Sequence, residues 1–214
     1  MKNFRLYLVL DTDVQDYARL LKIAQEAICF GVDIIQLRDK KGPAKDTLRF
    51  SQILLKSLKG KIPLIINDRL DLAIASGAQG VHLGQDDISL GMARRMMGKG
   101  AIIGVSCQTL EQAKSAQQKG ADYIGFGSVF KTKTKPDRDP MDLDLFTKVM
   151  NSIKIPIFAI GGINLENVKA LCERGVGRAA VCRAICEATN VPQITQQLKQ
   201  ILNDADNMGK IMRG

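Results

Sequence analysis

The sequence has no tryptophan and few other aromatic residues, three Tyr and seven Phe among 214 residues. Aliphatic side chains must therefore fill the core. The shortage also disfavours a nucleic-acid surface, which usually combines basic side chains with stacking aromatics. The 31 Lys and Arg exceed the 22 Asp and Glu, for a net charge of +9, and these charges are scattered along the chain. This composition indicates anionic small-molecule substrates and no nucleic-acid partner.

The sequence also lacks the residue spacing of a zinc or disulfide framework. The only histidine, His82, lies in the apolar run Gly80–Leu83. The cysteines are odd in number and contain no Cys-x-x-Cys pair; they are Cys29, Cys107, Cys172, Cys182 and Cys186. We interpret them as reduced thiols that pack as small hydrophobic residues. A zinc site is not expected.

No apolar run approaches the 18 or more residues of a membrane span. The apolar stretch near the N-terminus ends at Leu10 and is too short for the core of a secretory signal. We therefore expect a cytoplasmic protein with no membrane partner. Its length suits one domain with a full hydrophobic core.

Eight short apolar runs recur along the chain, most of them bounded by Gly, Asp or Asn. Their continuous apolar character and β-branched residues predict strands of a parallel sheet that is buried on both faces. The runs are Leu6–Leu10, Ile34–Leu37, Leu64–Ile66, Gly80–Leu83, Ile102–Val105, Tyr123–Phe126, Ile157–Ile160 and Ala179–Val181.

Helical patterns lie between the runs and often end at a glycine. They cover Tyr17–Phe30, Lys45–Leu58, Thr109–Lys119 and Leu165–Arg174, the third with a capping-box pattern and the last with Asn164 as its expected N-cap. Repeats of roughly 25 residues match one βα unit. The pattern predicts a single α/β domain, a TIM (β/α)8 barrel over residues 1–202, followed by a polar, flexible tail over 203–214.

A doubly wound open sheet is the alternative fold. It should carry a glycine-rich turn after the first strand. Here Asp11, Thr12 and Asp13 follow instead.

Polar residues follow most of the predicted strands, where a barrel of this kind places its active site. Asp68 and Asp87 follow adjacent strands and could share one Mg²⁺ ion on a substrate phosphate. Arg38, Lys40, Lys135 and the turn Gly161-Gly162 could hold phosphate oxygens. Each feature also has a simpler interpretation, since Asp68 could cap a helix and the Lys131–Lys135 run could be a solvated loop. Their occurrence at one rim, with both charge signs, favours a site for a diphosphate–metal complex.

Several consecutive blocks resemble the thiamine-phosphate synthase family, in order, from the second to the eighth predicted strand. They are Gln36-Leu37-Arg38-Asp39-Lys40, Ile66-Asn67-Asp68-Arg69, Gly80–Asp87, Ile103-Gly104-Val105-Ser106, Gly125–Phe130 with Thr132-Lys133-Thr134-Lys135, and Ala159–Ile163.

The resemblance implies two substrate subsites and one metal ion. The first subsite would bind hydroxymethylpyrimidine diphosphate through Gln36, Arg38, Lys40, Asn67, Ser106 and Lys135, with Mg²⁺ held by Asp68 and Asp87. The second would bind the thiazole phosphate through Thr132, Thr134, Gly162 and the backbone of Val181 and Cys182. Leu37, Asp39 and Lys133 lie in the same segments and are included among the substrate-binding residues. Arg38, Ser106 and Lys135 are the expected catalytic residues.

One residue departs from the family pattern, which usually has Ser where this chain has Cys182. A thiol is a poor hydrogen-bond donor. Phosphate binding at this position would therefore depend on backbone N–H groups.

Two other functions remain open at the level of sequence. A thiazole tautomerase-like isomerase would use a similar barrel without the diphosphate–metal residues. A non-catalytic barrel that binds a phosphate ligand or nucleic acid is suggested by the charge of +9 alone. The oligomeric state is also open, with a homo-oligomer as one outcome.

Overall fold

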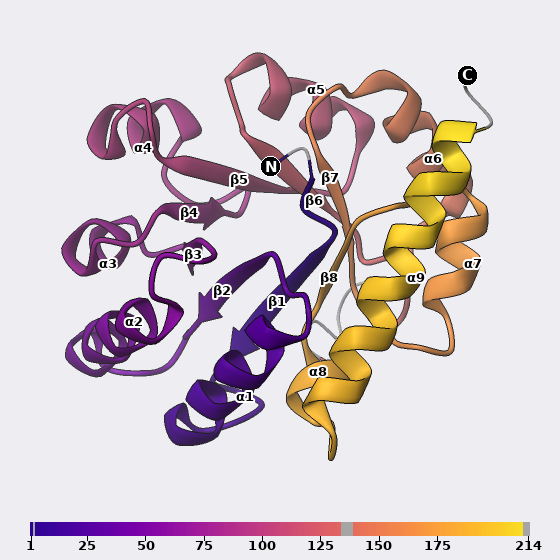
Figure 1. Ribbon diagram of the computed structural model, residues 1–214. Coiled ribbons are helices and arrows are strands. Elements are labelled where there is room, and N and C mark those ends of the chain that lie inside the picture. Colours follow the sequence, from indigo (N-terminus) through magenta and orange to yellow (C-terminus); the bar gives the residue numbers. More distant parts are fainter. Residues whose placement is uncertain (2, 134–138, 212–214) are drawn as a thin grey trace.

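The computed structural model describes residues 1, 3–133 and 139–211, with side chains up to residue 205. Its strands form a closed barrel in chain order, each parallel to the next, with β8 returning to β1. Figure 1 shows the helices arranged around this barrel. The strands are β1 Leu6–Asp11, β2 Ile34–Arg38, β3 Leu64–Asn67, β4 Gly80–Leu83, β5 Ile102–Cys107, β6 Tyr123–Phe126, β7 Ile157–Ile160 and β8 Ala179–Val181. The helices are α1 Tyr17–Cys29, α2 Ala44–Leu58, α3 Leu70–Ser76, α4 Leu90–Met97, α5 Leu110–Gln118, α6 Leu143–Ser152, α7 Val168–Glu173, α8 Arg183–Cys186 and α9 Val191–Ile211.

The predicted barrel fold is confirmed, and every predicted run forms a strand. Four strands extend beyond their apolar run by one or two residues. Parallel pairing continues there, with Asp11 opposite Arg38, and Asn67 opposite His82. Except for the buried Cys107 of β5, the added residues are polar, and pairing holds their side chains at fixed positions on the rim of the barrel.

The expected capping box of α5 is present. The Thr109 hydroxyl accepts a hydrogen bond from the Gln112 N–H at 3.2 Å, and the Gln112 side chain accepts one from the Thr109 N–H at 3.3 Å. The start of α7 was predicted wrongly, because the helix begins at Val168 and not at Leu165. The Asn164 side chain accepts from the N–H groups of Glu166 and Asn167, so it closes a turn instead of capping a helix.

The core has two layers. Aliphatic side chains such as Leu8, Leu37 and Ile124 fill the space between the strands and the surrounding helices. Inside the barrel, a smaller cluster contains the rings of Tyr7 and Tyr123. These rings pack edge-on against Phe158, with centroids 5.4 and 5.6 Å away. Other aromatic rings, such as those of Phe50, Phe126 and Phe146, belong to the outer layer of the core.

Helix α9 packs against α1, α7 and α8 and is the yellow helix of Figure 1. It continues through residue 203, where the sequence analysis placed the start of the tail, and Ala205 is still buried. Flexibility of the last residues stays a prediction. Among the helices of the described residues, none has the length and apolar character needed to cross a membrane.

Candidate active site

A cavity of about 340 Å³ opens at the carboxyl ends of the strands. It brings together many of the side chains that the sequence analysis selected. Those that line it are Gln36, Arg38, Asn67, Ser106, Thr132, Lys133, Gly162 and Cys182. Lys131 also lines it, although the lysine run had a simpler interpretation as a solvated loop. The predicted residues Thr134 and Lys135 lie outside the described residues.

Strand β2 supplies one wall of the cavity. Its side chains alternate, so Gln36 and Arg38 face the cavity while Leu37 packs into the layer beneath the helices and is 1% exposed. Arg38 is held by Asp11, whose two carboxylate oxygens accept from Arg38 Nη1 at 3.0 and 2.9 Å. Asp11 is fully buried. No role for Asp11 was predicted from the sequence, because its partner Arg38 is recognised only from the pairing of β1 with β2.

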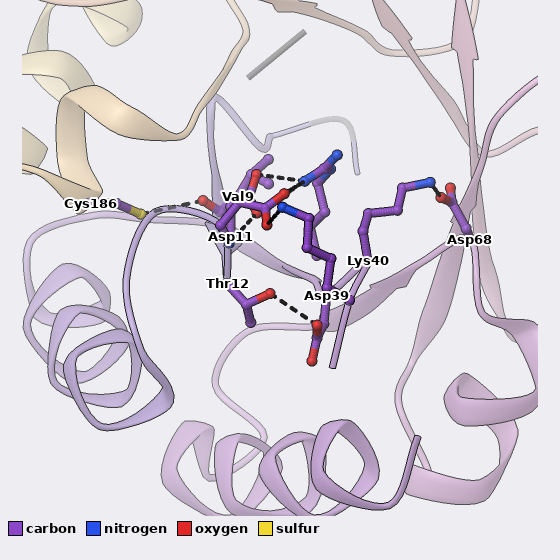
Figure 2. Close-up of polar contacts among 10 residues, drawn as sticks. Val9, Asp11, Thr12, Asp39, Lys40, Asp68 and Cys186 are labelled. Carbon is purple, nitrogen blue, oxygen red and sulfur yellow. Dashed lines mark hydrogen bonds and ion pairs between the residues drawn. The ribbon is translucent and has the colours of Figure 1, made fainter. Parts of the chain in front are cut away.

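Asp39 does not line the cavity. Its carboxylate accepts from Thr47 Oγ1 at 2.7 Å, from Thr12 Oγ1 at 3.0 Å and from the Gly42 N–H at 2.8 Å, and it also contacts the Tyr17 hydroxyl. Figure 2 shows the bond to Thr12. Burial opposes ionisation of Asp39, but these hydrogen bonds outweigh it and lower its pKa. The residue organises the loop between β2 and α2, from which Lys40 extends.

Lys40 and Asp68 form an ion pair across the tops of β2 and β3 (Figure 2). Asp68 does not cap α3, which removes the simpler interpretation of this residue. Its backbone has a φ of +60°, a conformation that is costly for a residue with a side chain. Such strain persists only where the surrounding structure enforces it, and it is common at functional sites.

Asp87 follows β4, the neighbour of β3, and its carboxyl group is close enough to that of Asp68 for each to shift the pKa of the other. The Gly84 N–H orients Asp87 with a hydrogen bond of 2.6 Å. Burial raises the pKa of Asp87, and the neighbouring Asp68 raises it further. At Asp68, burial also opposes ionisation, but the hydrogen bonds with Lys40 and Asp87 and the charge of Lys40 together outweigh it and lower the pKa. Two acidic groups in contact are the arrangement that a divalent cation would stabilise.

The described residues contain no cluster of three or more acidic, His or Cys side chains suited to a metal. Mg²⁺ usually has one or two carboxylate ligands and completes its shell with substrate phosphates and water. The pair Asp68 and Asp87 fits this kind of site.

On the opposite side of the barrel, the cavity wall includes the turn Gly161-Gly162 after β7 and residues after β8. Gly161 and Gly162 have φ values of +109° and +64°, which favour glycine. Successive N–H groups in such a turn can surround a phosphate. Val181 is buried, and Cys182 follows it at the cavity wall. A hydrogen bond with Cys186, together with burial, raises the pKa of the Cys182 thiol well above its ordinary value.

Gly162→Val should abolish binding of the thiazole phosphate with a smaller effect on the pyrimidine diphosphate. A Cβ on Gly162 would collide with the backbone oxygen of Lys131 and close the approach to the turn. Isothermal titration with each ligand measures the effect. Gly175→Val is the matched control, because Gly175 also has a positive φ, +85°, but faces open space. Equal losses in both variants would mean that backbone strain, and not the blocked turn, is responsible.

Sequence analysis missed a polar network below the cavity. His82 also lines the cavity, and its ring nitrogens contact Tyr123 and Ser106. The only signal in the sequence was a histidine inside a buried strand. That signal is weak, because a core histidine often has only a structural role.

Comparison with known proteins places this geometry in a family. Residues 6–185 match the family described as thiamine monophosphate synthase. The thiamine-phosphate synthase of Halalkalibacterium halodurans is 42% identical, over 94% of this chain and 97% of the relative. That of Clostridium acetobutylicum is 44% identical, over 89% of this chain and 92% of the relative.

Solved structures agree. Thiamine phosphate pyrophosphorylase from Pyrococcus furiosus superposes with a TM-score of 0.85 at 33% identity, covering 94% of this chain and 96% of that one. A 3-hexulose-6-phosphate synthase superposes at 0.71 with 16% identity, over 92% of this chain and 99% of that one, and shows the shared fold alone. With matches that span nearly the whole chain and reach above 40% identity, the chain belongs to the thiamine monophosphate synthase family.

Proposed function

We propose that this chain is a thiamine-phosphate synthase, a transferase that joins hydroxymethylpyrimidine diphosphate to the thiazole phosphate and releases pyrophosphate. The observation that carries the proposal is the arrangement of charged and glycine residues at the carboxyl ends of the strands. Asp68, Asp87 and Lys40 do not line the cavity themselves, but they lie at the ends of β2 to β4, next to the lining residue Asn67. The turn Gly161-Gly162 lines the cavity after β7, on the opposite side of the barrel. One end suits a metal-bound diphosphate, and the other suits a simple phosphate.

The pyrimidine diphosphate would bind along β2 and β3. Gln36 at the bottom of the cavity would contact the pyrimidine ring, while Arg38, Lys40 and Asn67 at the rim would contact the diphosphate. Arg38 uses one terminal nitrogen for Asp11 and Asp13, and among the described residues its other N–H groups have no hydrogen-bond partner, which leaves them for phosphate oxygens. Lys135 is proposed to contact the same diphosphate. Thr132 and Thr134 would contact the thiazole phosphate at Gly162.

The chemistry requires charge stabilisation and positioning. Mg²⁺ bound by Asp68 and Asp87 would supply positive charge beside the diphosphate. Arg38 and Lys40 stabilise the negative charge that develops on the departing pyrophosphate. The pyrimidine methylene carbon loses its bond to oxygen, becomes carbocation-like and is attacked by the thiazole nitrogen. The cavity holds the two reactants next to each other, so no protein nucleophile is needed.

The test is a coupled assay for pyrophosphate release with both substrates present. Release that requires both substrates, together with formation of thiamine phosphate, supports the proposal. Turnover of a thiazole phosphate alone would indicate the tautomerase-like isomerase. Salt-dependent retention on DNA without turnover would indicate a nucleic-acid-binding protein. The net positive charge is the only observation that favours this function. A cytoplasmic location and assembly into a homo-oligomer stay predictions from the sequence.

Cys182→Ser should leave turnover unchanged or lower the Michaelis constant for the thiazole phosphate by a few-fold. The thiol is a weak donor, and a hydroxyl at the cavity wall would add a stronger one. Steady-state kinetics with the thiazole phosphate varied will measure this. Cys172→Ser is a matched control, because Cys172 lies on α7 and does not line the cavity. A large loss specific to Cys182→Ser would show that the thiol, through its contact with Cys186, supports the local structure.

A further inference from the structure

A chain of hydrogen bonds crosses the barrel interior beneath the cavity. It begins at Gln36 on β2, whose Nε2 donates to the Tyr7 hydroxyl at 2.8 Å. The Tyr7 and Tyr123 hydroxyls are 2.8 Å apart, and Tyr123 lies 3.0 Å from His82 Nδ1. His82 Nε2 lies 2.9 Å from Ser106 Oγ on β5. Both ends of the chain, Gln36 and Ser106, line the cavity.

The two tyrosines lie too deep to contact a ligand. Tyr7 is 2% exposed, Tyr123 is 0% exposed, and neither lines the cavity. Burial raises the pKa of both phenols, so each keeps its proton. Gly104 makes room for Tyr123, since a Cβ there would overlap the phenol ring and its hydroxyl. The barrel thus accommodates a buried polar pair where apolar side chains would pack more simply.

The number of available protons fixes which group donates and which accepts in each of these hydrogen bonds. The Tyr7 oxygen accepts from Gln36, so its own proton must find an acceptor, and Tyr123 is its other hydrogen-bond partner among the described residues. Leaving a buried hydroxyl proton without an acceptor is costly. Tyr7 therefore donates to Tyr123, and Tyr123 in turn donates to Nδ1 of His82. The proton of the imidazole is then on Nε2, which donates to Ser106 Oγ.

A proton on Nδ1 of His82 would leave the hydroxyl proton of Tyr7 without an acceptor. If Nδ1 of His82 carried a proton, in either a neutral or a charged ring, it would donate to Tyr123, which would then donate to Tyr7. The Tyr7 oxygen would accept two hydrogen bonds, and its proton would have no acceptor among its partners. Only the Nε2–H tautomer satisfies every buried donor in this arrangement.

We propose that Tyr7 and Tyr123 are positioning residues, which hold His82 as its Nε2–H tautomer so that Ser106 directs its hydroxyl proton into the cavity. Ser106 accepts from His82 and is left with one donor for the substrate. Gln36 donates away from the cavity and presents its carbonyl oxygen to the substrate. The cavity therefore offers the carbonyl oxygen of Gln36 as an acceptor and the hydroxyl of Ser106 as a donor. An aminopyrimidine has the complementary groups, an amino group that donates and ring nitrogens that accept. The role for the substrate rests on the proposed function.

The tautomer can be measured without substrate, because His82 is the only histidine in the sequence. Long-range proton–nitrogen correlation spectra of nitrogen-15 histidine-labelled protein will show one ring. Nε2 couples to both carbon-bound ring protons, whereas Nδ1 couples strongly to one, so the two nitrogens can be assigned. We expect a protonated Nε2 and an unprotonated Nδ1. A proton on Nδ1, in a neutral or a charged ring, would overturn the proposal whether or not the protein has the proposed activity.

Variants then test the function of the chain. Tyr123→Phe removes the donor to Nδ1 and should give a mixture of tautomers, with kcat lowered about tenfold or more and KM changed less than about threefold. Tyr7→Phe should keep the tautomer, because Tyr123 still needs Nδ1 as its acceptor, but it frees Gln36 and should raise KM for the pyrimidine diphosphate. Gly104→Ala displaces Tyr123 without removing its hydroxyl and should reproduce the spectrum of Tyr123→Phe.

Ser51→Ala is the matched control for loss of a buried hydroxyl. The Ser51 hydroxyl donates to Thr47 O at 2.7 Å within α2, and its removal should change neither the His82 spectrum nor kcat. If Tyr123→Phe lowers the melting temperature but leaves both the tautomer and kcat unchanged, the tyrosines serve stability alone and the proposal is wrong.

Discussion

Removal of Mg²⁺ with EDTA should abolish turnover, and added Mg²⁺ should restore it. Asp68→Asn and Asp87→Asn should each lower kcat/KM on the order of 10²-fold or more, the usual loss when an electrostatic partner of the transition state is removed. The physical reason lies in the contact between the two carboxyl groups. Burial and Asp68 raise the pKa of Asp87, so the site is unfavourable for two negative charges until a cation joins them.

The same contact predicts what happens to stability. Neither substitution should lower the melting temperature of the metal-free protein by much, because each removes one of two neighbouring acidic groups. The ion pair that Asp68→Asn also breaks, with the partly exposed Lys40, contributes little to stability. Asp86→Asn is the matched control, since Asp86 is adjacent in sequence and exposed. Turnover that persists in EDTA would remove the metal from the proposal. Loss of activity in Asp86→Asn of the same size would show that the loop is sensitive to any change.

Arg38→Ala should cause two separable losses. Activity should fall by on the order of 10²-fold or more, because a fixed guanidinium beside the departing pyrophosphate is removed. The free energy of unfolding should fall by about 3–5 kcal/mol, because Asp11 would remain as a buried charge without its partner. Chemical denaturation and single-turnover kinetics measure the two effects independently.

The double variant Asp11→Asn with Arg38→Ala separates stability from activity. It should recover much of the stability, because no buried charge remains, but none of the activity. Arg38→Lys should also be impaired, since a single ammonium cannot serve Asp11 and a phosphate in the same way as a guanidinium. Arg174→Ala is the surface control, because its ion pair with Asp144 is exposed and contributes little. Recovery of activity together with stability in the double variant would assign Arg38 a purely structural role.

The fold was predictable because its signals are local. Each strand is a short apolar run, and the capping box that begins α5 involves residues only three positions apart. The start of α7 was the exception. Asn164 has the chemistry of a helix cap, but it also suits a turn, and the backbone of the following residues decides between the two.

The predicted site residues also divide into those that the local sequence was enough to find and those that it was not. Residues at the ends of strands, such as Gln36, Asn67 and Ser106, could be found from their order alone, because parallel strands of a barrel end at one rim. The sequence alone did not show which way the side chains of the neighbouring residues point. Leu37 adjoins cavity residues but faces the helices, since successive side chains of a strand point to opposite sides. Asp39 follows the strand, and its carboxylate is bound within the loop and by α2.

Only the tertiary structure identified the partners that hold the site together. Asp11 lies 27 residues before Arg38 and is bound to it at the rim, and Tyr7 lies 116 residues before Tyr123 and is bound to it inside the barrel. Asp11 was visible in the sequence as a polar residue after an apolar run, but its partner was not. Neither tyrosine was marked, because a buried tyrosine in an apolar strand is usually packing. Closure of the barrel brings β1, β4, β5 and β6 around one interior. The order of chemical groups along the rim was therefore determined by the sequence, and the hydrogen bonds that orient them were decided by closure of the barrel.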